Sequence, residues 1–372
     1  MISSPVAPSP SDAVTTFLNA KKFAFLIHLR HTYSDDMGLY WKPLRKIPNK
    51  VYRKIFTKLQ APSVKWSDIY LNGSAGEKWH IGRNEIILLN GKDILDQGPK
   101  NMSKNIERVI DKMTQKGYTN IGLGALTSPM TLGGALLKHR QDVSITNGNA
   151  FTATGLFRAI VKLLEASPNL MDHQTIVGAT GSVGSCLAGL LVKKNYCDKL
   201  LLVARNLSKL EKLKNDLKSI NPNVQIEVSN QISEIRKSNL ITLLTASADN
   251  IIGPEILKSN AVILDGTQPR NTSPELLVQR PDVTVIDGGI ISIPGITMSN
   301  GGIGLPLNHY YACFSETLLW ALDGQSEHFS IGNPTLEQAE YMDTLARKYK
   351  MFGFELADFT SFGKPLTNSF IS

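Results

Sequence analysis

The sequence predicts an α/β protein built around a Rossmann-like, doubly wound parallel sheet. From about residue 174 to 289, short β-branched runs alternate with helical or loop segments, as in parallel sheets whose strands are joined by helices. A glycine-rich turn follows the first run at 175–177 and leads directly into an apolar helix. Polar or glycine-containing turns end the later runs, for example Asp265-Gly266-Thr267.

A second α/β layer is expected before this region. Apolar runs at 23–30, 79–89, 119–126 and 143–146 predict strands, and 101–116 and 150–165 have helical spacing. We therefore expect a mobile tail at 1–12 and an N-terminal α/β substrate-binding domain at 13–167. A Rossmann domain at 168–304 would follow the linker Ser167-Pro168-Asn169. A helical segment at 305–372 would fold back on the cleft.

Composition limits the kind of protein. The 372 residues are 42% hydrophobic and 19% charged, which is typical of a globular chain rather than a disordered one. No apolar run is long enough to span a bilayer, no secretory signal is evident, and three cysteines indicate a reducing compartment. We expect a cytoplasmic protein without an integral membrane segment, a metal site or a nucleic-acid partner. The net charge of +8 and the basic cluster at 42–58 indicate either a solvated surface or a site for an acidic partner.

The glycine turn is the strongest local motif. Gly178, Gly181 and Gly184 have the spacing G-x-x-G-x-x-G between a predicted strand and a predicted helix. This context favours a turn that holds a dinucleotide pyrophosphate at a helix N-terminus, with Thr180, Ser182 and Val183 beside it. The alternative is a strand–turn–helix with incidental glycines.

The end of the second strand favours NADPH over NADH. A carboxylate usually stands there in NAD-binding domains, whereas this chain has Arg205, which can pair with a 2′-phosphate. A surface arginine is the alternative. Other strand ends should face the same ligand, although Asp265 and Asp287 could equally belong to plain turns. The further residues predicted to bind the cofactor are Asn206, Thr245, Ala246, Ser247, Asp265 and Gly266.

Cys313 differs from the other two cysteines. Cys186 has apolar neighbours and Cys197 lies in a short polar turn, so neither suggests chemistry. Cys313 opens a predicted helix, whose N-terminus would lower the pKa of the thiol. If the helix has already begun, His309 and Glu316 lie on the same face. A buried structural cysteine is the alternative.

Several strings together resemble the long-chain acyl-(acyl carrier protein) reductases of cyanobacteria and their bacterial relatives. The order of these motifs matches over about 23–342, and the cysteine-bearing string is the most specific of them. They are VGATGSVGS, LLLVARN, GALTS, TNGNAFTA, ILDGTQPRN and YACFSETLL.

The resemblance implies an NADPH-dependent reduction of an acyl thioester to a fatty aldehyde through an acylated Cys313. The thioester donor would be acyl carrier protein or coenzyme A, and an acidic carrier would suit the basic cluster. The loops with Thr127 and Ser128 and with Asn147 and Asn149 would flank the substrate, and the Ser128 hydroxyl is a candidate hydrogen-bond donor to the oxyanion. His309 is not part of the family pattern.

Two other functions remain open at this stage. A dehydrogenase of a small amino or hydroxy acid would share the dinucleotide-binding half without needing Cys313. A non-enzymatic NADPH-binding sensor would bind the cofactor without turnover. Acyl chain length, carrier and oligomeric state cannot be predicted from these patterns.

Overall fold

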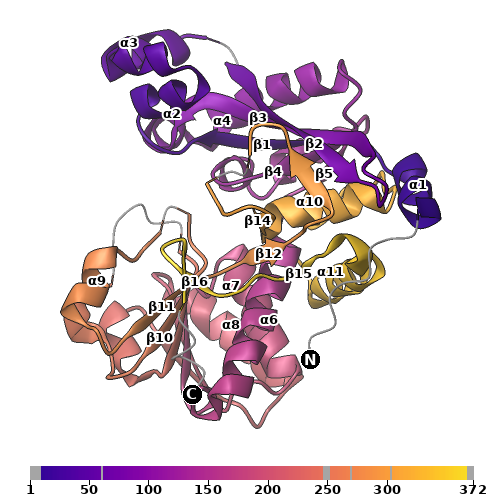
Figure 1. Ribbon diagram of the computed structural model, residues 1–372. Coiled ribbons are helices and arrows are strands. Elements are labelled where there is room, and N and C mark those ends of the chain that lie inside the picture. The colour runs from indigo at the N-terminus through magenta and orange to yellow at the C-terminus, as the bar shows by residue number, and fades with distance from the viewer. Residues whose placement is uncertain (1–9, 60–61, 246–251, 269, 302–303, 367–372) are drawn as a thin grey trace. The chain divides into compact units, whose positions relative to one another are not determined.

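A computed structural model describes residues 10–59, 62–245, 252–268, 270–301 and 304–366 (Figure 1). The chain divides into two compact units, each made of several chain segments. Unit 1 comprises 1–148, 292–332 and 342–355, and unit 2 comprises 149–291, 333–341 and 356–372. The division falls before α6 (Asn149–Ala166), not at the predicted linker after it, because α6 buries its apolar side in the core of unit 2. The first helix, α1 (Pro10–Asn19), begins inside the predicted tail.

The predicted doubly wound sheet is confirmed in unit 2. Its six strands are parallel and lie in the order β11-β10-β9-β6-β7-β8, the order of a dinucleotide-binding sheet. The strands are β6 (Gln174–Val177), β7 (Lys199–Val203), β8 (Gln225–Ser229), β9 (Leu240–Leu243), β10 (Val262–Asp265) and β11 (Thr284–Asp287).

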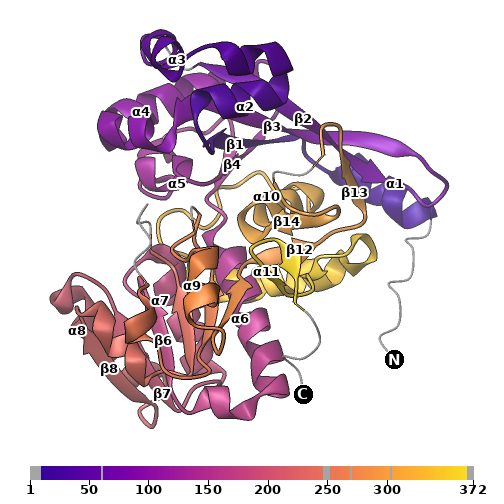
Figure 2. The ribbon, with the colours of Figure 1, turned by 60° about the vertical axis from the view of Figure 1, so that its left-hand side comes forward.

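Both faces of this sheet are buried, as expected for parallel strands. Successive residues of one strand enter different cores, so that Leu200 and Leu202 pack with α6 while Leu201 and Val203 pack on the opposite face. The first core also contains α7 (Ser182–Lys193) and α8 (Leu207–Ile220), and the second contains α9 (Pro274–Gln279) (Figures 1 and 2).

Unit 1 contains a second six-stranded sheet, in the order β13-β2-β3-β1-β4-β5, which is mixed. Strands β3, β1, β4 and β5 run parallel, and β2 and β13 are antiparallel additions at one edge. The bounds are β1 (Phe23–Leu29), β2 (Ser63–Asn72), β3 (Lys78–Asn90), β4 (Asn120–Leu123), β5 (Ser144–Thr146) and β13 (Ile296–Met298).

The helix that carries Cys313 packs within unit 1. On one face of the sheet lies α4 (Gly91–Thr114), which bends at Gly98 and Pro99. On the other lies α10 (Ala312–Leu322), whose Phe314 ring contacts Phe23 and Phe25 edge-on. Gly122 permits this approach, because a Cβ there would lie 2.1 Å from the Thr317 hydroxyl oxygen.

The remaining elements are shorter or lie at the unit boundaries. Helices α2 (Tyr33–Tyr40) and α3 (Asn49–Phe56) flank the 3₁₀ turn η1 (Lys42–Lys46). Thr127 and Ser128, expected on a loop, lie on the short helix α5 (Thr127–Met130). The others are β12 (Ile290–Ser292), β14 (His309–Tyr311), α11 (Leu336–Lys348), β15 (Glu355–Leu356), β16 (Thr360–Ser361) and β17 (Lys364–Pro365), with 3₁₀ turns at Ala135–Leu137, Pro168–Met171, Ile232–Lys237, Pro254–Ile256 and Lys350–Phe352.

No helix among the described residues has both the length and the apolar composition needed to cross a bilayer. No group of three or more His, Cys, Asp or Glu side chains in the described ranges is arranged to hold a metal ion.

Candidate active site

The glycine turn between β6 and α7 has the backbone that its sequence requires. Gly178 has φ +85°, and a Cβ there would lie 2.6 Å from the Leu244 carbonyl oxygen. At Gly184 a Cβ would lie 2.5 Å from the Gly178 carbonyl oxygen. The first glycine therefore permits the left-handed turn, and the last one lets α7 pack closely on the turn.

The middle glycine is the exposed N-cap of α7. Gly181 has φ −75°, and no side chain caps the helix there. Ser182 follows, and its hydroxyl oxygen accepts a hydrogen bond from the Asn149 side-chain amide at 2.9 Å. Helix α7 has twelve residues, and its first N–H groups have no side-chain cap at Gly181, so its N-terminus suits a dinucleotide pyrophosphate. Asn149, predicted beside the substrate, thus lies beside this turn.

After β7, Arg205 is free to contact a cofactor in solvent, whereas the Asn206 side chain is used in a helix cap. Arg205 is exposed directly after β7, as an arginine that pairs with a 2′-phosphate must be. The Asn206 side chain instead caps α8 by accepting from the Lys209 N–H at 2.9 Å. Thr245 follows β9, whereas Ala246 and Ser247 lie outside the described residues.

Asp265 is a turn residue by its contacts. The buried carboxylate accepts from the Thr267 N–H and hydroxyl on one oxygen, and from the Asn271 N–H and Thr272 hydroxyl on the other. Gly266 follows, and a Cβ there would lie 2.9 Å from the Leu244 side chain. These contacts favour the plain-turn alternative for Asp265.

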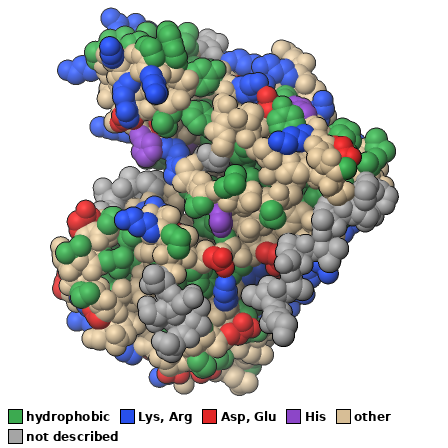
Figure 3. All heavy atoms as spheres, viewed as in Figure 1, with side chains coloured by type: hydrophobic (Ala, Val, Ile, Leu, Met, Phe, Trp, Pro, Cys, Tyr) green, Lys and Arg blue, Asp and Glu red, His purple; other side chains and the backbone are tan. Residues whose placement is uncertain are grey.

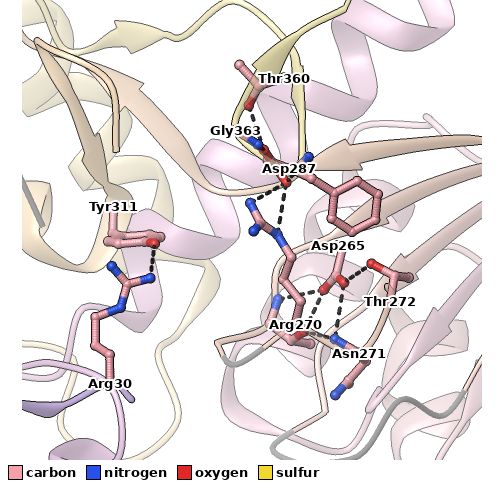
Figure 4. A network of polar contacts seen from close by, with 11 residues as sticks. Arg30, Asp265, Arg270, Asn271, Thr272, Asp287, Tyr311, Thr360 and Gly363 are labelled. Atoms are coloured by element: carbon pink, nitrogen blue, oxygen red, sulfur yellow. Dashed lines mark hydrogen bonds and ion pairs between the residues drawn. The ribbon is translucent and has the colours of Figure 1, made fainter. Parts of the chain in front are cut away.

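Asp287, the corresponding residue of β11, fixes the β16–β17 hairpin (Figure 4). Its carboxylate accepts from the Thr360 hydroxyl at 2.7 Å and from the Gly363 N–H at 2.8 Å. The Arg270 guanidinium pairs with the same carboxylate at 2.6 Å. Sequence reasoning missed this role, because the partners lie more than seventy residues further along the chain.

We expect Asp287→Ala to release the hairpin. The change leaves Arg270 and two hairpin donors without their shared acceptor, so the free energy of unfolding of unit 2 should fall by about 2–4 kcal/mol. Limited proteolysis should then cut near 360–365 faster than in the wild type. Asp282→Ala is the matched control, because it also removes an Asp–Arg ion pair of unit 2, and neither Asp282 nor its partner Arg280 bonds to the hairpin in the described contacts. Equal cleavage in both variants would contradict the role of Asp287.

In unit 1, Cys313 is the second residue of α10 and packs against the backbone of the 146–148 loop. A Cβ at Gly148, where φ is +78°, would lie 2.3 Å from the Cys313 Cβ. The expected drop in thiol pKa is not found. Burial raises the pKa of the Cys313 thiol to about 12; backbone hydrogen bonds from Phe314 oppose the rise, and the Glu316 charge adds to it. The helix N-terminus is therefore outweighed by desolvation.

Alkylation kinetics should follow this raised pKa. Because the thiolate is the reactive species, the rate constant for iodoacetamide at Cys313 should rise about tenfold per pH unit from neutral pH and should not level off below about pH 10. Peptide mapping of the modified site gives the rate at Cys313 alone. A plateau near neutral pH would show a lowered pKa instead.

Glu316 lies one turn after Cys313, as predicted, and is fully buried. Its Oε1 accepts from the Gly148 N–H at 2.9 Å, from the Ser330 hydroxyl at 2.7 Å and from the Thr146 hydroxyl. Glu316 thus holds the 146–148 loop that contacts Cys313. We interpret it as a positioning residue.

Other predicted site residues are tied into the fold of unit 1. His309 belongs to β14, before the helix, so the predicted helical spacing to Cys313 does not exist; its ring contacts the Leu307 carbonyl at 2.9 Å. The Asn147 amide donates to the carbonyls of Gly133, Ser330 and Gly332, which lie in two sequence-distant loops.

Thr127 and Ser128 are both buried on α5. The Thr127 hydroxyl donates to the Gly124 carbonyl at 2.7 Å, a structural bond that does not favour a role in substrate binding. Sequence reasoning missed Ser330. Its hydroxyl donates to the Asn147 side-chain oxygen and to the Glu316 carboxylate, and its backbone has φ +52°. No local motif marks Ser330, and only its positive φ in the structure distinguishes it.

The comparisons with known proteins agree with the resemblance stated above. The chain is 24% identical to the long-chain acyl-[acyl-carrier-protein] reductase of Synechococcus elongatus over 270 residues, which are 69% of this chain and 76% of that protein. It is also 23% identical to the aminotransferase PigE of a Serratia strain over 256 residues, 67% of this chain and only 30% of PigE. No known family model matches the chain. The chain is thus a distant homologue of the cyanobacterial reductase.

Solved structures also resemble it. Quinate dehydrogenase from Corynebacterium glutamicum in complex with NAD has a TM-score of 0.37 at 12% identity, covering 71% of this chain and 87% of that one. Escherichia coli K-12 YhdH with bound NADPH has a TM-score of 0.26 at 18% identity, covering 38% of this chain and 44% of that one. The dinucleotide-binding fold of unit 2 is established by its own strand order rather than by these likenesses.

Proposed function

We propose that this protein is a nicotinamide-dependent oxidoreductase that reduces an acyl thioester to an aldehyde, with Cys313 as the acylated nucleophile and NADPH as the cofactor. The observation that carries the proposal is that Cys313, at the start of α10, packs against Gly148 in the 146–148 loop, which Glu316 holds in place. The coarser part, an oxidoreductase that uses a nicotinamide dinucleotide, rests on the glycine turn, the sheet order and the distant reductase homologue.

Unit 1 would perform the acyl transfer. The Cys313 sulfur attacks the thioester carbonyl carbon, the new carbon–sulfur bond forms, and the carrier thiol leaves with the proton that Cys313 gives up. Backbone N–H groups in the first turn of α10 are candidates to donate to the oxygen that becomes negative. Because burial raises the pKa of the Cys313 thiol, the thiol would have to give up its proton during the attack for the carrier thiol to take it.

Unit 2 would hold the cofactor. Gly178, Gly181 and the first turn of α7 would hold the pyrophosphate, and Arg205 would pair with the 2′-phosphate. When bound, NADPH supplies the hydride that converts the acyl group to the aldehyde.

Arg205→Ser should change cofactor preference. Losing a guanidinium that pairs with a 2′-phosphate should raise the Kd for NADPH about ten- to a hundredfold and leave that for NADH nearly unchanged. Fluorescence titration of both cofactors measures this. Arg236→Ser, which removes another exposed arginine of unit 2, should leave both values unchanged. Equal losses for both cofactors would contradict a 2′-phosphate contact.

Intact-protein mass spectrometry tests the nucleophile. After incubation with long-chain acyl thioesters and no NADPH, the wild type should gain one acyl group, mapped to Cys313, and NADPH should remove it. Cys313→Ala should gain none, although it keeps Cys186 and Cys197, both buried. No adduct at any acyl length, with NADPH still bound, would reject Cys313 as nucleophile.

Turnover measurements on Cys313→Ala and the wild type test the two alternative functions, a small-substrate dehydrogenase and an NADPH-binding sensor. A small-substrate dehydrogenase should keep its turnover in Cys313→Ala, whereas a sensor should bind NADPH and turn over no thioester at all.

A further inference from the structure

We propose that the segment formed by α2, η1 and α3 (residues 33–59) is a membrane-contact surface that binds anionic lipid bilayers peripherally. This helical cap has a small core of its own. The Tyr52 ring stacks on both Tyr33 and Phe56. Asp93 of α4 accepts from the Tyr33 hydroxyl at 2.6 Å and from Arg53 at 2.7 Å. The cap is thus anchored to α4 through the buried Tyr33 and the exposed Arg53.

Large apolar side chains remain exposed on this cap. Leu39 and Trp41, at the end of α2, are 66% and 62% exposed, and Ile55 on α3 is 49% exposed. Figure 3 shows hydrophobic and basic side chains gathered side by side over α2 and α3. Monomeric soluble proteins rarely cluster such residues without a partner. The exposed members are Leu39, Tyr40, Trp41, Val51, Ile55 and Leu59.

Lysines stand next to these apolar residues. Lys50 and Lys54 lie one turn apart on α3, next to Val51 and Ile55, and Lys58 follows in the turn after the helix with the same four-residue spacing. None of these three lysines has an acidic partner among the residues that the structure describes, and they line an open hollow of about 590 Å³. Arg53, in contrast, forms ion pairs with Asp93 and Asp96.

Exposed apolar and aromatic side chains beside lysines that have no acidic partner among the described residues are typical of a helix that lies on an anionic bilayer. An acidic protein is the competing partner, because protein interfaces also combine apolar and charged residues, and the test below includes it. At a bilayer, lysines pair with lipid phosphates while apolar side chains enter the acyl boundary and aromatic rings lie at the headgroup level. The hollow that the three lysines line is also lined by Asp93 and Asp96, and both carboxylates are paired with Arg53.

Vesicle co-sedimentation of the full chain tests the proposal. The wild type should sediment with phosphatidylcholine vesicles containing roughly one third phosphatidylglycerol and should stay in solution with phosphatidylcholine alone. Lys50→Glu/Lys54→Glu/Lys58→Glu should lower the partition coefficient at least about a hundredfold. Trp41→Ser should lower it at low and high salt alike, because its contribution is apolar.

The matched control is Lys116→Glu/Lys138→Glu/Lys212→Glu, which reverses three exposed lysines that lie outside the cap. It should bind vesicles like the wild type, and all variants should bind NADPH equally. Equal loss in the two triple variants would overturn the proposal, as would a wild type that ignores anionic vesicles. Binding of a purified acidic carrier protein to the cap without vesicle binding would also overturn it.

Discussion

Glu316→Ala is expected to lower the free energy of unfolding of unit 1 by about 3–5 kcal/mol and to abolish acylation of Cys313. The substitution leaves the Thr146 hydroxyl, the Gly148 N–H and the Ser330 hydroxyl without their shared buried acceptor. A buried donor left unsatisfied costs about 1–3 kcal/mol. The Thr146 hydroxyl and the Gly148 N–H lose the Glu316 acceptor, whereas the Ser330 hydroxyl keeps the Asn147 side-chain oxygen. Urea unfolding and acyl-adduct formation measure the two effects.

Glu316→Gln is the matched control for this result. Its side-chain oxygen can still accept at the Oε1 position, so we expect a loss of about 1–2 kcal/mol and acylation that is slowed but present. If Ala and Gln have equal effects, the charge rather than the acceptor matters. If neither variant affects acylation in folded protein, Glu316 does not position the loop for chemistry.

Gly178→Ala is expected to have the largest effect on cofactor binding. The added methyl group must adopt φ +85° and would lie 2.6 Å from the Leu244 carbonyl oxygen. We expect NADPH affinity to fall at least about a hundredfold, with a loss of about 2–4 kcal/mol in the stability of unit 2. Calorimetric titration and thermal unfolding measure both.

Gly181→Ala separates the two effects. Gly181 has φ −75°, and its Cβ would meet only the Gly178 carbonyl oxygen at 3.1 Å, so the fold should survive. The methyl group would nevertheless stand where the pyrophosphate approaches, and affinity should fall about tenfold. Unchanged NADPH affinity in Gly181→Ala would place the cofactor elsewhere.

Local patterns predicted most of the parallel framework. The run at 175–177, the glycine turn and the helix after it are short-range features, and β6 and α7 confirm them. Strand β2 was not predicted, because it mixes polar and aromatic residues at an antiparallel edge and pairs with β13, more than two hundred residues away. Element α4 begins ten residues before the predicted helix because a first helical segment precedes it, separated from the predicted one by the non-helical Gly98 (φ +67°, ψ 169°) and by Pro99.

The candidate site was predictable where spacing along one helix decides the geometry. Glu316 follows Cys313 by one turn, and the structure confirms that relation. His309 was misplaced because the helix begins at Ala312, which sequence alone does not mark. The partners of Glu316 come from Thr146, Gly148 and Ser330, and only the tertiary fold brings them together. The prediction of a lowered Cys313 pKa was wrong, because burial raises it and the sequence around a helix start does not reveal how deeply the thiol is buried.

The interleaved path of the chain has a consequence for biosynthesis. Ala339, in the 333–341 segment, is fully buried in the same core as α6 and α7, and the hairpin at 360–365 is fastened to Asp287. While the ribosome is still translating the residues after 291, all six strands of the parallel sheet exist but part of their covering does not. The nascent sheet therefore stays incompletely covered until residues 333–341 and 360–365 have been synthesised, and a chaperone that shields apolar surface would act during this interval.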